Sequence, residues 1–124
     1  MPYRLVGHAE DRIDVLLLDS AKRWGIPAAA RYHRLILAAA AIAGENPTFA
    51  GSREAPRLPG VRTLHLRSMR GLVPAEHRVA EPRHLLVYRV AVDGVVEILS
   101  VVHDRMLLAR AARRAIDAAK GERP

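Results

Sequence analysis

Residues 83–102, RHLLVYRVAVDGVVEILSVV, decide the fold. Two runs rich in valine, leucine and isoleucine, residues 83–90 and 95–102, flank the step Asp93-Gly94. β-Branched residues favour strands, and glycine supplies the positive φ that a tight turn requires. The stretch therefore predicts a β-hairpin. Because the two runs carry Val, Leu, Ile and Tyr, we expect this hairpin to lie at the centre of a buried sheet.

Two helical patterns precede the hairpin. Apolar and small residues recur at spacings of 3, 4 and 7 between Ile13 and Trp24, which predicts a first helix that ends at Gly25. The same spacing between Tyr32 and Ala43 predicts a second helix. Since the connection between them is short, the two helices must pack antiparallel as a helical hairpin.

The remaining elements are shorter. Residues 2–6 and 61–66 are strand candidates, whereas residues 45–60 contain repeated Pro and Gly and are predicted to be a loop. A last helix is expected at about 104–120, with Asp104 able to cap its start.

The resulting order, β-α-α-β-β-β-α, is typical of an α+β fold, with the helical hairpin packed on a small, mainly antiparallel sheet and a C-terminal helix. At 124 residues the chain is expected to form one domain, residues 1–124, with its core within about 3–110. The side chains predicted to be buried are Ile13, Leu17, Trp24, Leu35, Ile36, Leu86, Val87, Ile98 and Val101.

Composition excludes several classes of site. The chain has no cysteine, so disulfides, thiolate catalysis and cysteine-type zinc sites are excluded. The six histidines lack the spacing of metal-binding motifs, and we expect neither a metal nor a cofactor. No apolar run approaches the roughly 20 residues of a membrane span, and residues 1–7 lack the apolar segment of a signal peptide, so a cytoplasmic location is expected.

Positive charge is concentrated in the middle of the chain. The formal net charge is +7; residues 53–89 hold eight basic and three acidic residues, whereas the segments before and after each hold six basic and five acidic residues. This excess predicts an electropositive surface that suits an acidic partner, either nucleic acid or an acidic protein segment. Arginines and histidines of this kind could hold a phosphate and move protons, but they could equally be solvated or paired with acids.

Two polar residues of the hairpin region have a structural and a functional interpretation. Tyr88 alternates with Leu86 and Val90, which favours a core aromatic with its hydroxyl at the rim over a catalytic role. His103 stands where the last strand meets the last helix, and sheet ends are where polar groups converge. Its side chain is therefore a candidate for function or for hydrogen bonding.

Several fragments of the chain form a recognisable series: Tyr3-Arg4-Leu5, Arg23-Trp24-Gly25, Ala30-Arg31-Tyr32, Glu45-Asn46-Pro47, His65-Leu66-Arg67 and the motif that runs from Arg83 to Met106. In their order and spacing, these fragments resemble the ParE toxins of the RelE/ParE superfamily. RelE-like members of this superfamily are ribosome-dependent messenger RNA endoribonucleases, which use Arg or Lys on the sheet and usually a Tyr near the C-terminus. ParE members inhibit DNA gyrase instead.

The end of the chain favours the gyrase inhibitor. Residues 106–124 contain no Tyr and a single Lys, Lys120. The resemblance therefore implies a toxin of a type II toxin–antitoxin system that inhibits gyrase, is not an enzyme and serves plasmid or chromosome maintenance. Two alternatives remain open at this point: a RelE-type ribonuclease that uses Arg67, Arg89 and His103, or a degenerate toxin that acts only as an antitoxin-binding module.

The resemblance also implies a partner, a ParD-like antitoxin whose acidic, partly disordered C-terminal segment wraps the toxin, so that DNA is contacted only through the antitoxin. We expect Ala39 and Ala40 to line a groove in the helical hairpin that receives this segment. The residues expected to contact antitoxin or target are Arg67, Arg70, Arg83, Arg89, His103 and Arg105.

Overall fold

The computed structural model of the protein describes residues 3–106 and 108–122. Within these ranges the side chains at positions 70, 72, 77, 108, 109, 111, 121 and 122 lie outside the description. The elements in chain order are β1 (Tyr3–Leu5), α1 (Gly7–Trp24), α2 (Ile26–Glu45), β2 (Ser52–Glu54), β3 (Val61–His65), the 3-10 helices η1 (Leu66–Leu72) and η2 (Ala75–His77), β4 (His84–Val90), β5 (Val96–His103) and α3 (Leu108–Glu122).

The predicted hairpin is the centre of the sheet. Five strands lie in the order β1-β5-β4-β3-β2; β1 runs parallel to β5 and the other neighbours are antiparallel. At the β4–β5 turn Gly94 has φ +85°, and its N–H donates to the Ala91 carbonyl at 2.9 Å. The Val95 N–H donates to the Asp93 carboxylate at 3.1 Å. The Asp-Gly step therefore forms the turn that the sequence predicts, and the α+β, mainly antiparallel fold is confirmed.

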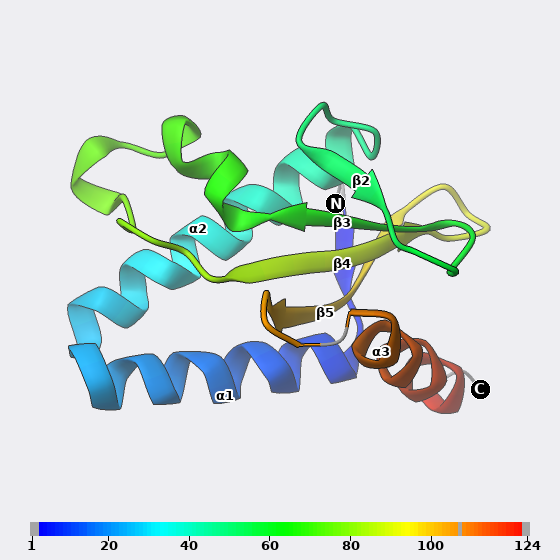
Figure 1. Ribbon diagram of the computed structural model, residues 1–124, viewed down its shortest axis with the longest axis horizontal. Coiled ribbons are helices and arrows are strands. Elements are labelled where there is room, and N and C mark those ends of the chain that lie inside the picture. Colours follow the sequence, from blue (N-terminus) through cyan, green and yellow to red (C-terminus); the bar gives the residue numbers. More distant parts are fainter. Residues whose placement is uncertain (1–2, 107, 123–124) are drawn as a thin grey trace.

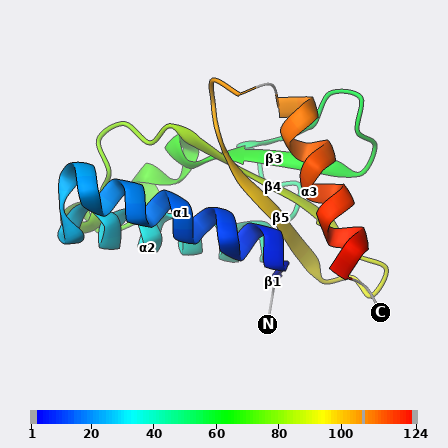
Figure 2. The same cartoon turned by 90° about the horizontal axis from the view of Figure 1, so that it is seen from below.

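Two layers of helices cover the sheet (Figures 1 and 2). The α1–α2 hairpin packs on one face, where Leu64, Leu86 and Ile98 point, and α3 packs near β5 on the other face. The side chains of β4 alternate between these faces, since Leu86 joins the first cluster and Val87 the second. The α3 side of the second cluster consists of Ala112, Ala115, Ile116 and Ala119.

Two predicted boundaries are wrong. Ser52–Glu54, predicted to be loop, pairs as β2 with β3, from Ser52 opposite Leu64 to Glu54 opposite Arg62. This edge strand is short and polar, so it carries no apolar alternation that a sequence pattern could reveal. The last helix begins at Leu108 rather than near Asp104. Asp104 does not cap it, because its carboxylate binds His65 and Arg83 instead.

The predicted core is largely confirmed. Ile13, Leu35, Ile36, Leu86, Val87, Ile98 and Val101 are buried, and Leu17 is partly buried. Tyr88 is fully buried, and its hydroxyl donates to the Pro47 carbonyl at 2.6 Å, as expected of a core aromatic.

Two expectations about the helical hairpin are wrong. Trp24 is 74% exposed, because α1 continues past the last of its residues that contact the core, Leu17. Ala39 and Ala40 have no exposed surface, since both pack inside the core beneath α2. They therefore do not line an open groove.

Among residues 3–106 and 108–122, no helix combines the length and apolarity needed to cross a membrane.

Candidate functional site

Three histidines meet at one end of the sheet. β3 ends at His65, β5 ends at His103, and β4 begins at His84, which lies directly opposite His103 in the β4–β5 register. The Asp104 N–H donates to the Arg83 carbonyl at 2.8 Å, which continues the backbone pairing one step beyond the strands. We call the set Tyr32, His65, Arg83, His84, His103 and Asp104 the strand-end cluster.

Asp104 is the anionic centre of the strand-end cluster. Its Oδ2 lies 3.1 Å from His65 Nε2, and its Oδ1 lies 3.1 Å from Arg83 Nη2. His103 Nδ1 is 3.4 Å from the same Oδ1. Burial alone would raise the pKa of Asp104, but the hydrogen bond from His65 and the charges of Arg83 and His103 hold that pKa below its ordinary value. Asp104 is therefore a carboxylate at neutral pH.

The backbone assigns the tautomers of two histidines. The Arg67 N–H donates to His65 Nδ1 at 3.0 Å, and the Arg105 N–H donates to His103 Nδ1 at 3.1 Å. A ring nitrogen that accepts a hydrogen bond carries no proton, so in each neutral ring the hydrogen is on Nε2. His65 accordingly donates Nε2–H to Asp104. The same assignment leaves Nδ1 of His103 without a proton to give Asp104, so their 3.4 Å separation is no hydrogen bond.

Tyr32 ties α2 to the cluster. Its hydroxyl accepts the Arg83 N–H at 3.1 Å and lies 2.6 Å from His84 Nδ1, to which it donates if that ring is neutral. Burial raises the pKa of Tyr32. Burial, followed by the neighbouring His103, lowers the pKa of His84 from 6.5 to about 4. At neutral pH the pair is therefore an uncharged phenol donating to an uncharged imidazole.

The lowered pKa of His84 makes stability depend on pH. The unfolded chain protonates this ring near pH 6.5, whereas the folded chain does so only near pH 4. Between these values the unfolded state binds more protons, so the free energy of unfolding should fall as the pH is lowered from about 6.5 to 4. His84→Asn keeps an acceptor for the Tyr32 hydroxyl but does not titrate, and it should flatten this dependence. Urea unfolding at pH 7 and at pH 4.5 measures the loss in the free energy of unfolding between the two pH values. An equal loss for the wild type and for His84→Asn would contradict this prediction.

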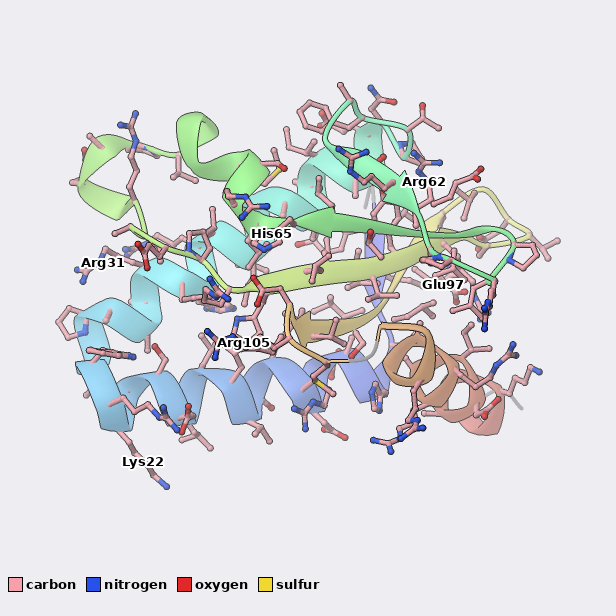
Figure 3. All side chains as sticks on the ribbon, in the orientation of Figure 1. Lys22, Arg31, Arg62, His65, Glu97 and Arg105 are labelled. Atoms are coloured by element: carbon pink, nitrogen blue, oxygen red, sulfur yellow. The ribbon has the colours of Figure 1, made fainter. Side chains whose placement is uncertain are left out.

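A second charge network lies at the opposite end of the central hairpin (Figure 3). Glu97, which is almost fully buried, accepts a hydrogen bond from Arg89 Nε at 3.0 Å and lies 3.4 Å from Arg4 Nη2. Arg4 also binds Asp93 at 2.8 Å. The side chains of His65 and Arg105 stand at the other end of the sheet in the same view. Five residues of strand, about 17 Å at the usual rise, separate Arg89 from the level of His84 and His103.

The structure brings only some of the predicted site residues together. Arg83 and His103 belong to the strand-end cluster, and the exposed Arg67 and Arg105 adjoin it through their backbone N–H groups. Arg89 is bound to Glu97 far from this group. The side chain of Arg70 lies outside the described part of the chain. The trio Arg67, Arg89 and His103 is therefore not assembled into one site.

Sequence reasoning missed two members of the cluster. The sequence pattern places Tyr32 on the apolar face of the second helix and Asp104 at the start of the last helix, and assigns neither of them to a site. The available signal for Asp104 was its place directly after a strand-ending histidine, within a basic segment that needs a counter-charge. No local pattern pairs Tyr32 with residues more than fifty positions away, because that contact depends on how α2 crosses the sheet.

Basic side chains in and beside the cluster are partly or fully exposed to solvent. Arg83 and His103 keep 46% and 39% of their side-chain surface exposed, and Arg67 and Arg105 are exposed beside them. Such groups can bind carboxylates or phosphates. Among the described residues, no three histidine or acidic side chains are grouped to hold a metal ion.

A family model described as the ParE toxin of a type II toxin–antitoxin system, parDE, matches residues 3–108. No curated protein matches the sequence. The matched range begins with β1, includes all five strands and both helices of the hairpin, and reaches the first residue of α3.

Proposed function

Since the chain belongs to the family of ParE toxins of type II toxin–antitoxin systems, we propose that it stops growth by inhibiting DNA gyrase and that a ParD-like antitoxin neutralises it. Membership of the family makes the chain a toxin with an antitoxin partner. What we propose beyond family membership is that the target is DNA gyrase and that the antitoxin is ParD-like.

One observation carries the choice of target. Cleaving a phosphodiester without a metal requires cationic and proton-transferring side chains around the same phosphate. Arg89 is held by buried Glu97, about five strand residues from His103, so the two side chains do not reach one phosphate. The side chains of Arg67 and Arg105 remain as exposed charges. The trio Arg67, Arg89 and His103 is therefore not assembled around one phosphate, which supports a protein that binds its target over a ribonuclease that uses this trio.

The exposed charges beside the strand-end cluster support the proposed antitoxin. Arg67, Arg83 and Arg105 form a surface whose charge is complementary to an acidic segment. A disordered acidic tail can order itself along such a surface, and charge complementarity mainly raises its rate of association. Because Ala39 and Ala40 are buried inside the helical hairpin, we expect the antitoxin to contact this charged surface instead.

Expression of the toxin alone tests the proposal. We expect DNA breaks, filamentous cells and arrested division, while messenger RNA stays intact. Co-expression of the reading frame next to the toxin gene, if it encodes a protein with an acidic tail, should restore growth and serves as the control. Mapping of RNA 5′ ends would detect cleavage of transcripts. If transcripts are cleaved in phase with codons on ribosomes, the gyrase proposal is wrong and the ribonuclease alternative replaces it.

A further inference from the structure

The end of the helical hairpin carries large apolar side chains in solvent. Trp24, the last residue of α1, is 74% exposed, and Ile26, the first residue of α2, is 77% exposed. The residues of α1 that pack on the core end at Leu17, so the last turns of α1 extend beyond the core. Figures 1 and 2 show the α1–α2 connection at one extremity of the molecule, away from α3. Tryptophan is enriched among the residues that dominate binding energy at interfaces.

The turn that presents these two side chains is well defined. The Gly25 N–H donates to the Ala21 carbonyl at 2.9 Å and closes α1, and the Gly25 carbonyl accepts the Ala29 N–H at 3.2 Å and opens α2. Gly25 has φ +93°, a conformation that a side chain would strain. Pro27 further restricts the first turn of α2. An apolar pair held on a fixed turn loses little conformational entropy when it is buried by a partner.

Positive charge surrounds the apolar pair. Residues 22–34, which we call the hairpin tip, contain four basic residues and no acidic residue. Arg23 is paired with Asp19, one turn earlier in α1, at 3.2 Å. Lys22 and Arg31 lie at this end of the molecule in Figure 3. The hairpin tip therefore fits an apolar pocket that is bordered by acidic side chains.

We propose that the hairpin tip docks on DNA gyrase, with Trp24 and Ile26 entering an apolar pocket that has an acidic rim. The inference rests on the proposed function, since it assigns the surface that contacts the target. The shape of the tip favours a folded protein over the antitoxin tail. Two apolar side chains that project from a turn are best buried in a preformed pocket, which a folded partner offers. A disordered segment instead adapts to a surface by lying along it. The two anchors, Trp24 and Ile26, are not part of the Arg67, Arg83 and Arg105 surface assigned to the antitoxin, although Tyr32 of the hairpin tip adjoins that surface through its hydrogen bond with the Arg83 N–H.

The test measures inhibition of DNA supercoiling by purified gyrase with the full-length toxin and its variants. Trp24→Ala and Ile26→Ala remove the two anchors singly and together. Both residues are largely exposed, so the variants should fold with an unchanged unfolding midpoint. Val92→Ala is the matched control, because Val92 is a fully exposed apolar residue in the β4–β5 turn at the other end of the molecule.

We expect Trp24→Ala to raise the toxin concentration for half-inhibition by about 30-fold or more, as for an interface hot spot. The double variant should raise this concentration further, and Val92→Ala should inhibit at the same concentration as the wild type. Full inhibition by the double variant would overturn the assignment of the tip, while leaving the gyrase proposal in place. Failure of the wild-type toxin to inhibit gyrase would instead refute the proposed function, and the docking surface with it. Tight binding of the wild type to phosphatidylglycerol vesicles that Trp24→Ala abolishes, without any change in gyrase inhibition, would identify a membrane anchor and also overturn the inference.

Discussion

Replacing Glu97 with alanine is expected to lower the free energy of unfolding by about 3–5 kcal/mol, the range found when one partner of a buried ion pair is removed. The Glu97 carboxylate lies between Arg89 and Arg4, and it is the counter-charge for an Arg89 side chain that is only 19% exposed. Within the described part of the chain, Nη2 of Arg89 is already buried without a hydrogen-bond partner. Removing Glu97 would leave the largely buried Arg89 guanidinium without this carboxylate partner.

Glu54 provides the matched control. Its side chain is 88% exposed and lies 4.0 Å from Arg62, so Glu54→Ala should change stability by less than about 1 kcal/mol. Chemical denaturation at pH 7 compares the two variants. Similar, small losses for both would show that Glu97 does not hold the network together.

Leu35→Ala is expected to cost about 2–5 kcal/mol, because it opens a cavity in the core between α2 and the sheet. Leu35 has no exposed surface and packs among the core residues of the first cluster. Leu18, on α1 of the same helical hairpin, is 63% exposed and is the control. Leu18→Ala should lie within about 0.5 kcal/mol of the wild type. Equal losses at the two positions, measured by urea unfolding, would contradict the packing of the helical hairpin on the sheet.

The parts of the fold that sequence could predict are those with a local signal. The β4–β5 hairpin follows from two β-rich runs and one Asp-Gly step, and the helices follow from apolar residues at helical spacing. Strand β2 has no such signal, because three polar residues become a strand only through their pairing with β3. Trp24 keeps the helical spacing of α1 but lies beyond the end of the core, and spacing alone does not tell how far a helix overhangs its sheet.

The candidate site was predictable in composition but not in geometry. The basic segment and its histidines were visible in the sequence, and Arg83 and His103 do meet at the strand ends. The register decides which residues share an end: it places His84 opposite His103 and Arg89 opposite Glu97. Tyr32 and Asp104 joined the cluster through contacts between distant segments, which no local pattern encodes.

The central claim, that this toxin acts on gyrase, is tested most directly by a supercoiling reaction with purified gyrase and relaxed plasmid. We expect toxin in molar excess to abolish supercoiling, and ribosomes programmed with messenger RNA and incubated with the same toxin to keep their transcripts intact. Undiminished supercoiling at saturating toxin, together with cleavage of the ribosome-bound transcripts, would contradict it.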